Sequence, residues 1–342
     1  MRVLIVKTSS MGDIIHTLPA LTDAGIACPD IRFDWVVEEQ VAEIPRWHPL
    51  IRKVIPVAIR RWRKNLFNST VRQEIQSFCE TLRFEKYDLI IDAQGLFKTI
   101  WISFLAKGPV SGFDRYSARE PLTSLFYARK FSASWKWHAV TRLRSLFSQA
   151  LGYAMPETVA DYGIDRQRFV DQAAQSDYLV FLHGTTWATK HWPEQYWIEL
   201  AEIANKNGLR VKLPWGNEEE QKRAERIAAN CNKVEVLPRL GLMDMAKVLA
   251  GAKVVVAVDT GLGHLAAALN VPTVSLYGPT DPVLVGAMGQ SQIHLSAKFP
   301  CAPCLSRECT YRGLEKQAVE PPCFGTVRPA DVWNACQSVF VR

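Results

Sequence analysis

The chain has 342 residues, of which 48% are hydrophobic and 22% charged, a composition typical of a globular protein with room for two domains. No apolar run approaches the roughly 18 residues of a membrane span, and the first residues lead directly into a predicted strand, so we expect neither a transmembrane helix nor a signal peptide. The excess of 41 Lys and Arg over 34 Asp and Glu suits an anionic partner without identifying it.

Short apolar runs alternate with helical patterns along the first half of the chain. The predicted strands cover residues 3–6, 33–37, 53–57, 87–91 and 110–113. The predicted helices cover residues 38–47, 71–84, 96–105 and 137–151, besides one that follows the first strand. Alternation at this period is typical of parallel βαβ units.

A stretch of weak periodicity at residues 152–176 predicts a domain boundary, after which the alternation resumes. Strands are expected at 178–182, 209–213, 234–237, 254–258 and 273–276, and helices at 193–207, 218–230, 244–249 and 331–341. We therefore predict an α/β protein of two doubly wound parallel-sheet domains that face each other across a cleft. The expected divisions are residues 1–165, residues 166–328 and a closing helix at 329–342.

The turn after the first predicted strand carries the most informative polar residues. Ser9, Ser10, Gly12 and Asp13 stand where that strand gives way to a helix. In open α/β sheets, ligands bind at the carboxyl ends of strands, which makes Asp13 the first candidate for catalysis. Asp is also a favoured helix cap, and residue type alone leaves these two roles about equally open.

A glycine-rich turn follows the most apolar strand. Gly261, Gly263 and Ala266 match the G-x-G-x-x-A spacing of dinucleotide-binding folds, and the helix that follows offers free N–H groups to phosphate. The spacing alone is weak evidence, so a nicotinamide-dependent dehydrogenase and a purely structural turn remain alternatives.

A second candidate phosphate loop lies between residues 181 and 194. Thr185 and Thr186 follow a strand, and Lys190 precedes a helix that begins near Pro193, which suits a diphosphate. The alternative is a capping loop with a surface lysine. Because the chain contains no Asp-x-Asp pair to hold a divalent ion, we expect Lys190, hydroxyls and helix N-termini to meet the charge of a leaving group.

Two further clusters stand out. The basic run 60–64 surrounds a tryptophan and suits phosphates or carboxylates, although a solvated charge run is the alternative and no nucleic-acid motif accompanies it. Eight cysteines in a chain expected to be cytoplasmic do not indicate a disulfide framework. Four of them are a candidate tetrahedral zinc site, with reduced thiols as the alternative: Cys301, Cys304, Cys309 and Cys323.

Taken together, these segments resemble the lipopolysaccharide heptosyltransferases of glycosyltransferase family 9, and the enzymes that add the first heptose (type I) in particular. The resemblance covers almost the whole chain and is carried by VKTSSMGDIIHTLPALTDA, VIPVAIRRWRK, LIIDAQGL, SAREPL, TTWATKHWPE, VDTGLGHLAAAL and YGPTDP. It implies a GT-B fold of two Rossmann-like domains, an acceptor-binding one followed by a donor-binding one, and inversion at the anomeric carbon without a metal ion or cofactor.

The resemblance also implies roles for individual residues. Asp13 matches the general base, and Lys190 matches the residue that neutralises the departing ADP. The matched donor contacts are Thr185, Thr186, Lys190, Glu220, Leu240, Asp259, Thr260, Gly261, Leu262 and His264. The matched acceptor contacts are Ser10, Arg60, Arg61, Arg63, Lys64 and Arg119.

The implied reaction moves L-glycero-D-manno-heptose from ADP-heptose to Kdo2–lipid A in the lipopolysaccharide inner core. It implies a cytoplasmic enzyme in peripheral contact with the inner membrane and no nucleic-acid partner. The Cys-rich tail resembles type II members, which add the second heptose, so type II remains the nearest alternative. A nucleotide-binding protein without catalysis is a more distant one.

Overall fold

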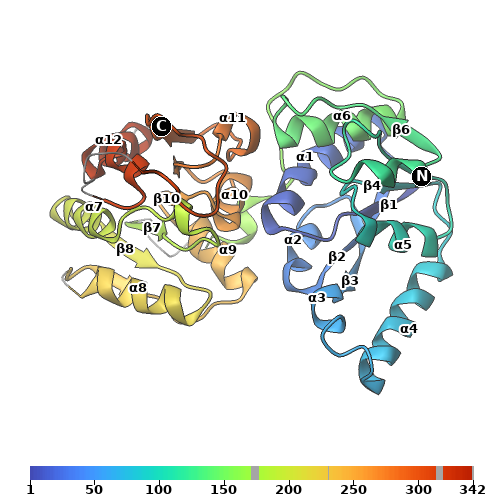
Figure 1. Cartoon of the computed structure of the whole chain (residues 1–342), viewed down its shortest axis with the longest axis horizontal. Coiled ribbons are helices and arrows are strands. Elements are labelled where there is room, and N and C mark those ends of the chain that lie inside the picture. The colour runs from blue at the N-terminus through green and yellow to red at the C-terminus, as the bar shows by residue number, and fades with distance from the viewer. Residues whose placement is uncertain (171–176, 230, 313–318, 341–342) are drawn as a thin grey trace. The chain divides into compact units, whose positions relative to one another are not determined.

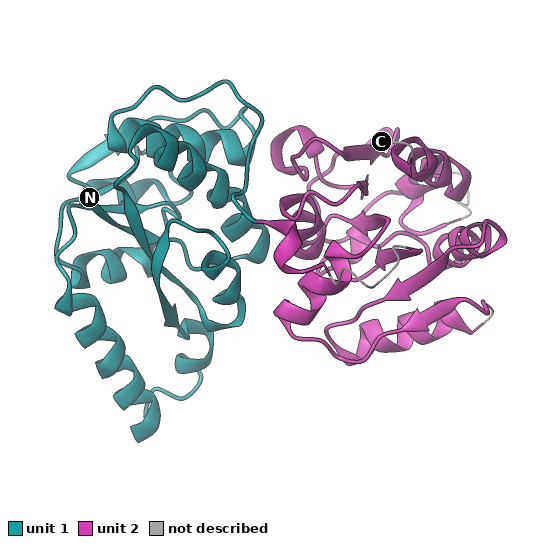
Figure 2. Cartoon of the chain, turned by 180° about the vertical axis from the view of Figure 1, so that it is seen from behind, with its two compact units in different colours: residues 1–164 teal, residues 165–342 magenta. Residues whose placement is uncertain are grey.

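The structure is a computed structural model that describes residues 1–170, 177–229, 231–312 and 319–340. The chain divides into two compact units, Met1–Ile164 and Asp165–Arg342, each described here by itself (Figures 1 and 2). Within the described residues, no helix combines the length and apolar character needed to cross a membrane.

Unit 1 is built on a six-stranded parallel sheet with the order β3-β2-β1-β4-β5-β6 (Figure 1). Its strands are β1 (Arg2–Val6), β2 (Arg32–Glu38), β3 (Ile51–Val57), β4 (Leu89–Asp92), β5 (Val110–Phe113) and β6 (Arg129–Phe131). Its α-helices are α1 (Met11–Ala27), α2 (Glu43–Arg46), α3 (Ile59–Trp62), α4 (Ser69–Phe84), α5 (Phe97–Leu105) and α6 (Ala139–Leu151). Two short 3-10 helices complete it, η1 (Glu39–Val41) and η2 (Pro121–Phe126).

Strand β1 lies in the middle of this sheet and is buried on both faces. Val3 pairs with Phe33 of β2 and with Leu89 of β4, so β1 has a parallel neighbour on either side. Leu4 and Val6 belong to the core under α4 and α5, whereas alternate residues point to the opposite face. The strand order reverses between β1 and β4, and ligands of doubly wound folds bind at such a point.

Unit 2 repeats the plan with the order β12-β11-β10-β7-β8-β9, again parallel throughout. Its strands are β7 (Tyr178–Leu182), β8 (Arg210–Leu213), β9 (Val234–Val236), β10 (Val254–Val258), β11 (Thr273–Tyr277) and β12 (Gln292–Ser296). Its α-helices are α7 (Glu194–Lys206), α8 (Glu218–Ala228), α9 (Leu242–Ala250), α10 (Gly261–Ala268), α11 (Pro282–Val285) and α12 (Pro329–Phe340), and its 3-10 helices are η3 (Arg166–Arg168), η4 (Ala188–Lys190) and η5 (Pro322–Thr326). Here the order reverses between β7 and β10.

The predicted α/β class with two doubly wound sheets is confirmed, and each predicted strand is present within one or two residues at its ends. The sequence patterns missed β6 and β12. Both are edge strands, where polar residues such as Arg129 and His294 break the apolar run typical of a buried strand. Of the predicted helices, α8 ends at Ala228 and α12 at Phe340, while residues 230 and 341 lie outside the described part.

Candidate functional site

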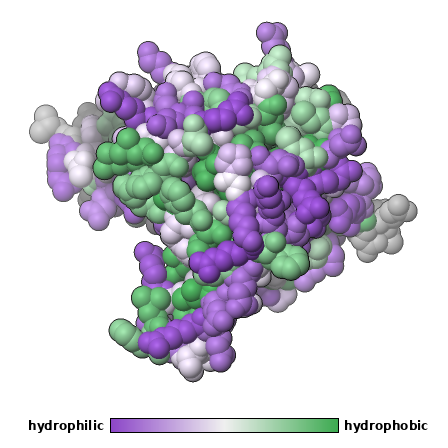
Figure 3. All heavy atoms as spheres, turned by 90° about the vertical axis from the view of Figure 1, so that its right-hand side faces the viewer, coloured by the Kyte–Doolittle hydropathy of each residue, from purple (hydrophilic) through white to green (hydrophobic). Residues whose placement is uncertain are grey.

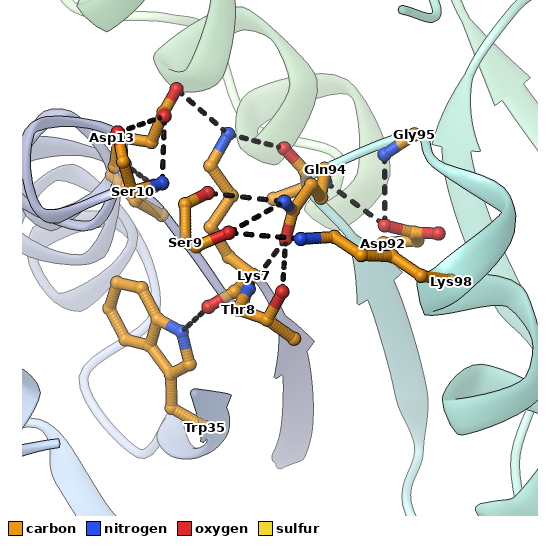
Figure 4. A network of polar contacts seen from close by, with 12 residues as sticks. Lys7, Thr8, Ser9, Ser10, Asp13, Trp35, Asp92, Gln94, Gly95 and Lys98 are labelled. Atoms are coloured by element: carbon orange, nitrogen blue, oxygen red, sulfur yellow. Dashed lines mark hydrogen bonds and ion pairs between the residues drawn. The ribbon is translucent and has the colours of Figure 1, made fainter. Parts of the chain in front are cut away.

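Asp13 lies in the first turn of α1, directly after the loop that leaves β1 (Figure 4). The backbone N–H and the hydroxyl of Ser10 donate hydrogen bonds to Oδ2 of Asp13, at 2.9 and 2.7 Å. The Asp13 side chain is 37% exposed. Asp13 therefore does cap the helix, and because Ser10 occupies only Oδ2, capping leaves Oδ1 open to a further partner.

The nearest cation to that carboxylate is Lys7, whose side chain is only 9% exposed. Its Nζ lies 3.7 Å from Oδ1 of Asp13 and donates to the carbonyl of Ala93 at 3.0 Å. Burial raises the pKa of Asp13, but Lys7, the Ser10 hydrogen bonds and His16 outweigh it and lower this pKa to about 2. The pKa of Lys7 is itself lowered by burial. Asp13 is therefore a carboxylate across the whole neutral range, as a general base must be.

Residues after β4 hold this loop in place, as Figure 4 shows. The side-chain carbonyl of Gln94 accepts hydrogen bonds from the N–H and hydroxyl of Thr8, at 2.6 and 2.9 Å, and its amide donates to the carbonyl of Ser9 at 3.1 Å. Lys98 donates to the hydroxyl of Ser9 at 2.9 Å. Behind them, buried Asp92 accepts the N–H groups of Gln94 and Gly95. Strands β1 and β4 are adjacent, so residues 85 or more positions apart in sequence meet here.

The predicted acceptor cations do not all share one role. Arg61 forms ion pairs with Glu39 at 3.0 Å and Glu74 at 2.9 Å, beside a groove of about 570 Å³ between β3 and α4. Arg60, Arg63, Lys64 and Arg119 are exposed, as is Ser10. Burial lowers the pKa of Lys98, and the charges of Arg60 and Arg63 lower it further, which places these cations within electrostatic range of the Asp13 loop.

Arg142 is a cation that sequence reasoning missed. Its guanidinium lies 3.5 Å from the ring centroid of Trp135 and 5.2 Å from that of Phe113, and it donates to the carbonyl of Ser117 at 2.6 Å. Burial lowers its pKa to about 10. Its charge also lowers the pKa of Lys7, as does that of Arg119. Lys98 and Arg142 were missed because only the packing of whole elements brings them to this loop. Lys98 lies on α5, which follows the β1 neighbour β4, whereas Arg142 lies on α6, which packs against α1.

In unit 2, an ion pair joins the two loops at the reversal of strand order. Lys190 after β7 lies 2.6 Å from Oδ2 of Asp259 after β10, and the Thr280 hydroxyl donates to the same oxygen at 2.9 Å. His264 Nε2 lies 3.7 Å from Oδ1, and the Thr185 hydroxyl donates to the Asp259 carbonyl at 3.1 Å. Burial raises the pKa of Asp259, but His264 and Lys190 outweigh it, so the net pKa is well below the ordinary value.

The helix α10 begins beside this pair. Thr260 is its N-cap residue, and Gly261 and Leu262 form the first turn, where backbone N–H groups have no partner within the helix. At Gly263 an added Cβ would lie 3.1 Å from the Cβ of Ala257, so glycine allows α10 to pack closely on β10. The geometry suits an anion bound at the N-terminus of α10, with Lys190 alongside.

The remaining predicted donor contacts lie in the first turn of α8, which holds Glu220, and on neighbouring loops. The Glu220 carboxylate accepts the N–H of Gly216 at 2.8 Å and lies so close to Gly184 that a Cβ there would approach Cδ of Glu220 to 2.6 Å. Leu240 is half-buried in the loop before α9, and Thr186 is exposed. Trp187 packs under Lys190, whose Nζ lies 4.4 Å from its ring centroid.

The four cysteines of the candidate zinc site lie at different depths in unit 2. Cys301, Cys304 and Cys309 are exposed, whereas Cys323 is buried in η5, and among the described residues no group of three or more His, Cys, Asp and Glu side chains could hold a metal ion. Burial, followed by the charges of the other three cysteines, raises the pKa of Cys323 to about 11. One thiol thus lies in the core and three at the surface, and the zinc site stays a prediction.

The chain is similar in sequence and in fold to known glycosyltransferases. The model of glycosyltransferase family 9 (heptosyltransferase) matches residues 75–315. Lipopolysaccharide heptosyltransferase 1 of Pseudomonas aeruginosa is 58% identical over 100% of this chain and 98% of its own length. Heptosyltransferase WaaC of E. coli with ADP superposes with a TM-score of 0.88 and 47% identity, over 99% of this chain and 100% of WaaC. WaaC with ADP-2-deoxy-2-fluoro heptose gives a TM-score of 0.84, also at 47% identity and with 99% of each chain covered.

Proposed function

This chain belongs to glycosyltransferase family 9, the heptosyltransferases, and we propose that it transfers L-glycero-D-manno-heptose from ADP-heptose to Kdo2–lipid A with inversion. The observation that carries this mechanism is the ionised, part-exposed carboxylate of Asp13 at the reversal of strand order in unit 1. The dehydrogenase alternative for the Gly261 turn is wrong, because the family is one of glycosyltransferases.

The chemistry assigned to Asp13 is general-base catalysis. As the acceptor hydroxyl attacks the anomeric carbon of the heptose, its proton passes to Oδ1 of Asp13, and the bond from the anomeric carbon to the ADP oxygen breaks on the opposite side. Ser10 orients the carboxylate through Oδ2, and Lys7 keeps it ionised. Lys7 acts through Asp13 and is a positioning residue.

The donor is assigned to the N-terminus of α10 and the loop after β7. Lys190, held by Asp259, neutralises the diphosphate as ADP departs, and the α10 N–H groups bind its oxygens. The other donor contacts in this proposal are Thr185, Thr186, Glu220, Leu240, Thr260, Gly261, Leu262 and His264. The proposed reaction needs neither a metal ion nor a cofactor, because cations of the chain meet the leaving-group charge.

The acceptor is assigned to the cations around the Asp13 loop. A sugar acid such as Kdo presents carboxylates, which guanidinium groups bind in a bidentate manner. We assign this contact to Arg60, Arg63, Lys64, Arg119 and Ser10. Lys98 joins them because it reaches the same loop, whereas Arg61 has its guanidinium engaged by two glutamates. Since the acceptor is a lipid, the proposal includes peripheral contact with the cytoplasmic face of the inner membrane.

The test is release of ADP from ADP-heptose in the presence of EDTA. Kdo2–lipid A is compared with the same acceptor already bearing one heptose. Turnover with the unsubstituted acceptor alone supports the proposal. Turnover with the heptosylated acceptor alone would assign the chain to type II, and dependence on an added divalent ion would contradict the metal-free mechanism.

A further inference from the structure

Helix α5 and the 3-10 helix η2 expose a set of large apolar side chains on unit 1. Each of them is between 36% and 71% exposed. We call this set the α5–η2 patch, and it consists of Phe97, Trp101, Phe104, Leu122, Leu125 and Phe126.

The patch is continuous across the two helices. Phe97, Trp101 and Phe104 are spaced four and three residues apart, which aligns them along one face of α5. The rings of Phe104 and Phe126 meet edge to face, with centroids 5.9 Å apart. Glu120, just before η2, accepts the N–H of Phe97 at 2.5 Å and so ties the two helices together. Figure 3, which shows the side of unit 1 where α5 lies, displays hydrophobic patches bordered by hydrophilic residues.

Helix α5 carries apolar residues on its exposed side as well as on its buried side. Ile100 and Ile102 are buried in the core together with Thr99 and Ser103, and the Thr99 hydroxyl donates to Asp92 at 2.8 Å, while the aromatic residues are exposed. A helix of a globular protein normally turns its apolar face to the core. Large apolar groups exposed together mark an interaction surface, and aromatic residues are preferred where that surface meets lipid headgroups.

The charge around the patch selects the kind of partner. Between residues 97 and 130 the chain carries six Lys and Arg and only two acidic residues. Both carboxylates accept hydrogen bonds from the backbone. Asp114 accepts the N–H groups of Tyr116 and Ser117, and Glu120 accepts the N–H of Phe97. An exposed apolar patch on a segment with this excess of positive charge matches the interface of a bilayer that contains anionic phospholipids.

We infer that the α5–η2 patch docks unit 1 onto an anionic phospholipid bilayer. The inference rests on the proposed function in one respect, that the acceptor is itself a membrane lipid. Lys98 lies on α5 and donates a hydrogen bond to Ser9 of the Asp13 loop. Because α5 has nine residues and is only about 13 Å long, its exposed aromatic residues lie close to that loop. A bilayer at the patch therefore holds an acceptor headgroup within reach of Asp13 while its acyl chains stay in the membrane.

The test is flotation of the full chain with vesicles of phosphatidylcholine alone or with phosphatidylglycerol added. The patch variant combines Phe104→Ser, Leu122→Ser and Leu125→Ser. The control variant combines Leu66→Ser, Phe67→Ser and Phe84→Ser, which are exposed apolar residues of unit 1 outside the patch, each at least half exposed. We expect wild type and control to float with the anionic vesicles, and the patch variant to bind about tenfold less. ADP release with a water-soluble, deacylated acceptor should be the same for all three proteins, which also verifies that the variants are folded.

Three outcomes would overturn the inference. The first is that the patch variant floats as well as wild type, and the second is that the control loses as much binding as the patch variant. The third is that the patch variant changes only the sedimentation coefficient, which would make the patch a contact between two copies. Flotation requires no heptose transfer. If wild type binds vesicles through the patch but transfers no heptose, the proposed function fails and the docking surface stands.

Discussion

Each unit carries a lysine–aspartate pair where its strand order reverses, and the two pairs are exposed in opposite ways. In unit 1 the lysine is the buried partner, with Lys7 9% and Asp13 37% exposed. In unit 2 the aspartate is the more buried partner, at 9% for Asp259 against 15% for Lys190, and it is bonded by Thr280 as well. In the proposed mechanism, the more exposed partner meets the ligand and the other one sets its charge. The same two residue types would thus supply a base in unit 1 and a phosphate-binding cation in unit 2.

The comparison predicts the largest loss of activity for Asp13→Asn. We expect kcat to fall by about a thousandfold, because the amide cannot accept the proton. The midpoint of thermal unfolding should change less than for Asp259→Asn, because the Lys7–Asp13 pair is looser, at 3.7 Å, and Lys7 keeps its hydrogen bond to the Ala93 carbonyl. Steady-state ADP release and a melting curve measure the two effects, and a variant that keeps most of its turnover would remove Asp13 from the role of base.

For Asp259→Asn the expected effect is on stability. Removing the charge leaves Lys190 with no anion in a largely buried position, and breaking such a pair costs about 3–5 kcal/mol. Urea unfolding measures it, with Asp13→Asn as the matched control. Equal stabilities of the two variants would show that the pairs do not differ in the way proposed.

Lys190→Met should lose donor binding and turnover together. We expect kcat/KM for ADP-heptose to fall by about a hundredfold, because the departing diphosphate loses its cation. KM for the acceptor should be unchanged. A variant that affected only the acceptor would place Lys190 in a different role.

Lys7→Met tests the charge coupling within unit 1. Without the ammonium the pKa of Asp13 rises from about 2 towards its ordinary value, by about one unit or more. The base form is lost as pH falls through that pKa, so the acid limb of the kcat profile should move to higher pH, while kcat at pH 7 changes far less. An unmoved acid limb would mean that Lys7 only packs the loop.

The smallest expected effect is that of Arg61→Ala. Its guanidinium is engaged by Glu39 and Glu74, so KM for the acceptor should stay within about twofold of wild type. The matched variant Arg60→Ala should raise that KM several-fold, with KM for ADP-heptose unaffected. Equal effects of the two substitutions would contradict the division of roles among these cations.

Local sequence was informative wherever the partners of a side chain lie within one loop. Ser10 and Asp13 are three residues apart, so their contact could be anticipated from helix-capping patterns alone. The loop at residues 181–194 and the glycine-rich turn at Gly261 could be predicted as phosphate-binding candidates for the same reason. A strand followed by a loop and a helix forms such a candidate site from one continuous segment. The spacing of the four cysteines, by contrast, does not say which thiol the core takes up: Cys323 is buried, whereas the other three are exposed.

By itself, then, the sequence determined the two doubly wound units, the positions of Asp13, Lys190 and Asp259 after their strands, and the family. Only the tertiary structure decided which residues complete the sites. Gln94 and Lys98 reach the Asp13 loop because β4 pairs with β1, and Asp259 reaches Lys190 because β10 pairs with β7. The physical reason is that apolar periodicity specifies the face and type of an element, whereas the order of strands depends on how whole elements pack to bury that face.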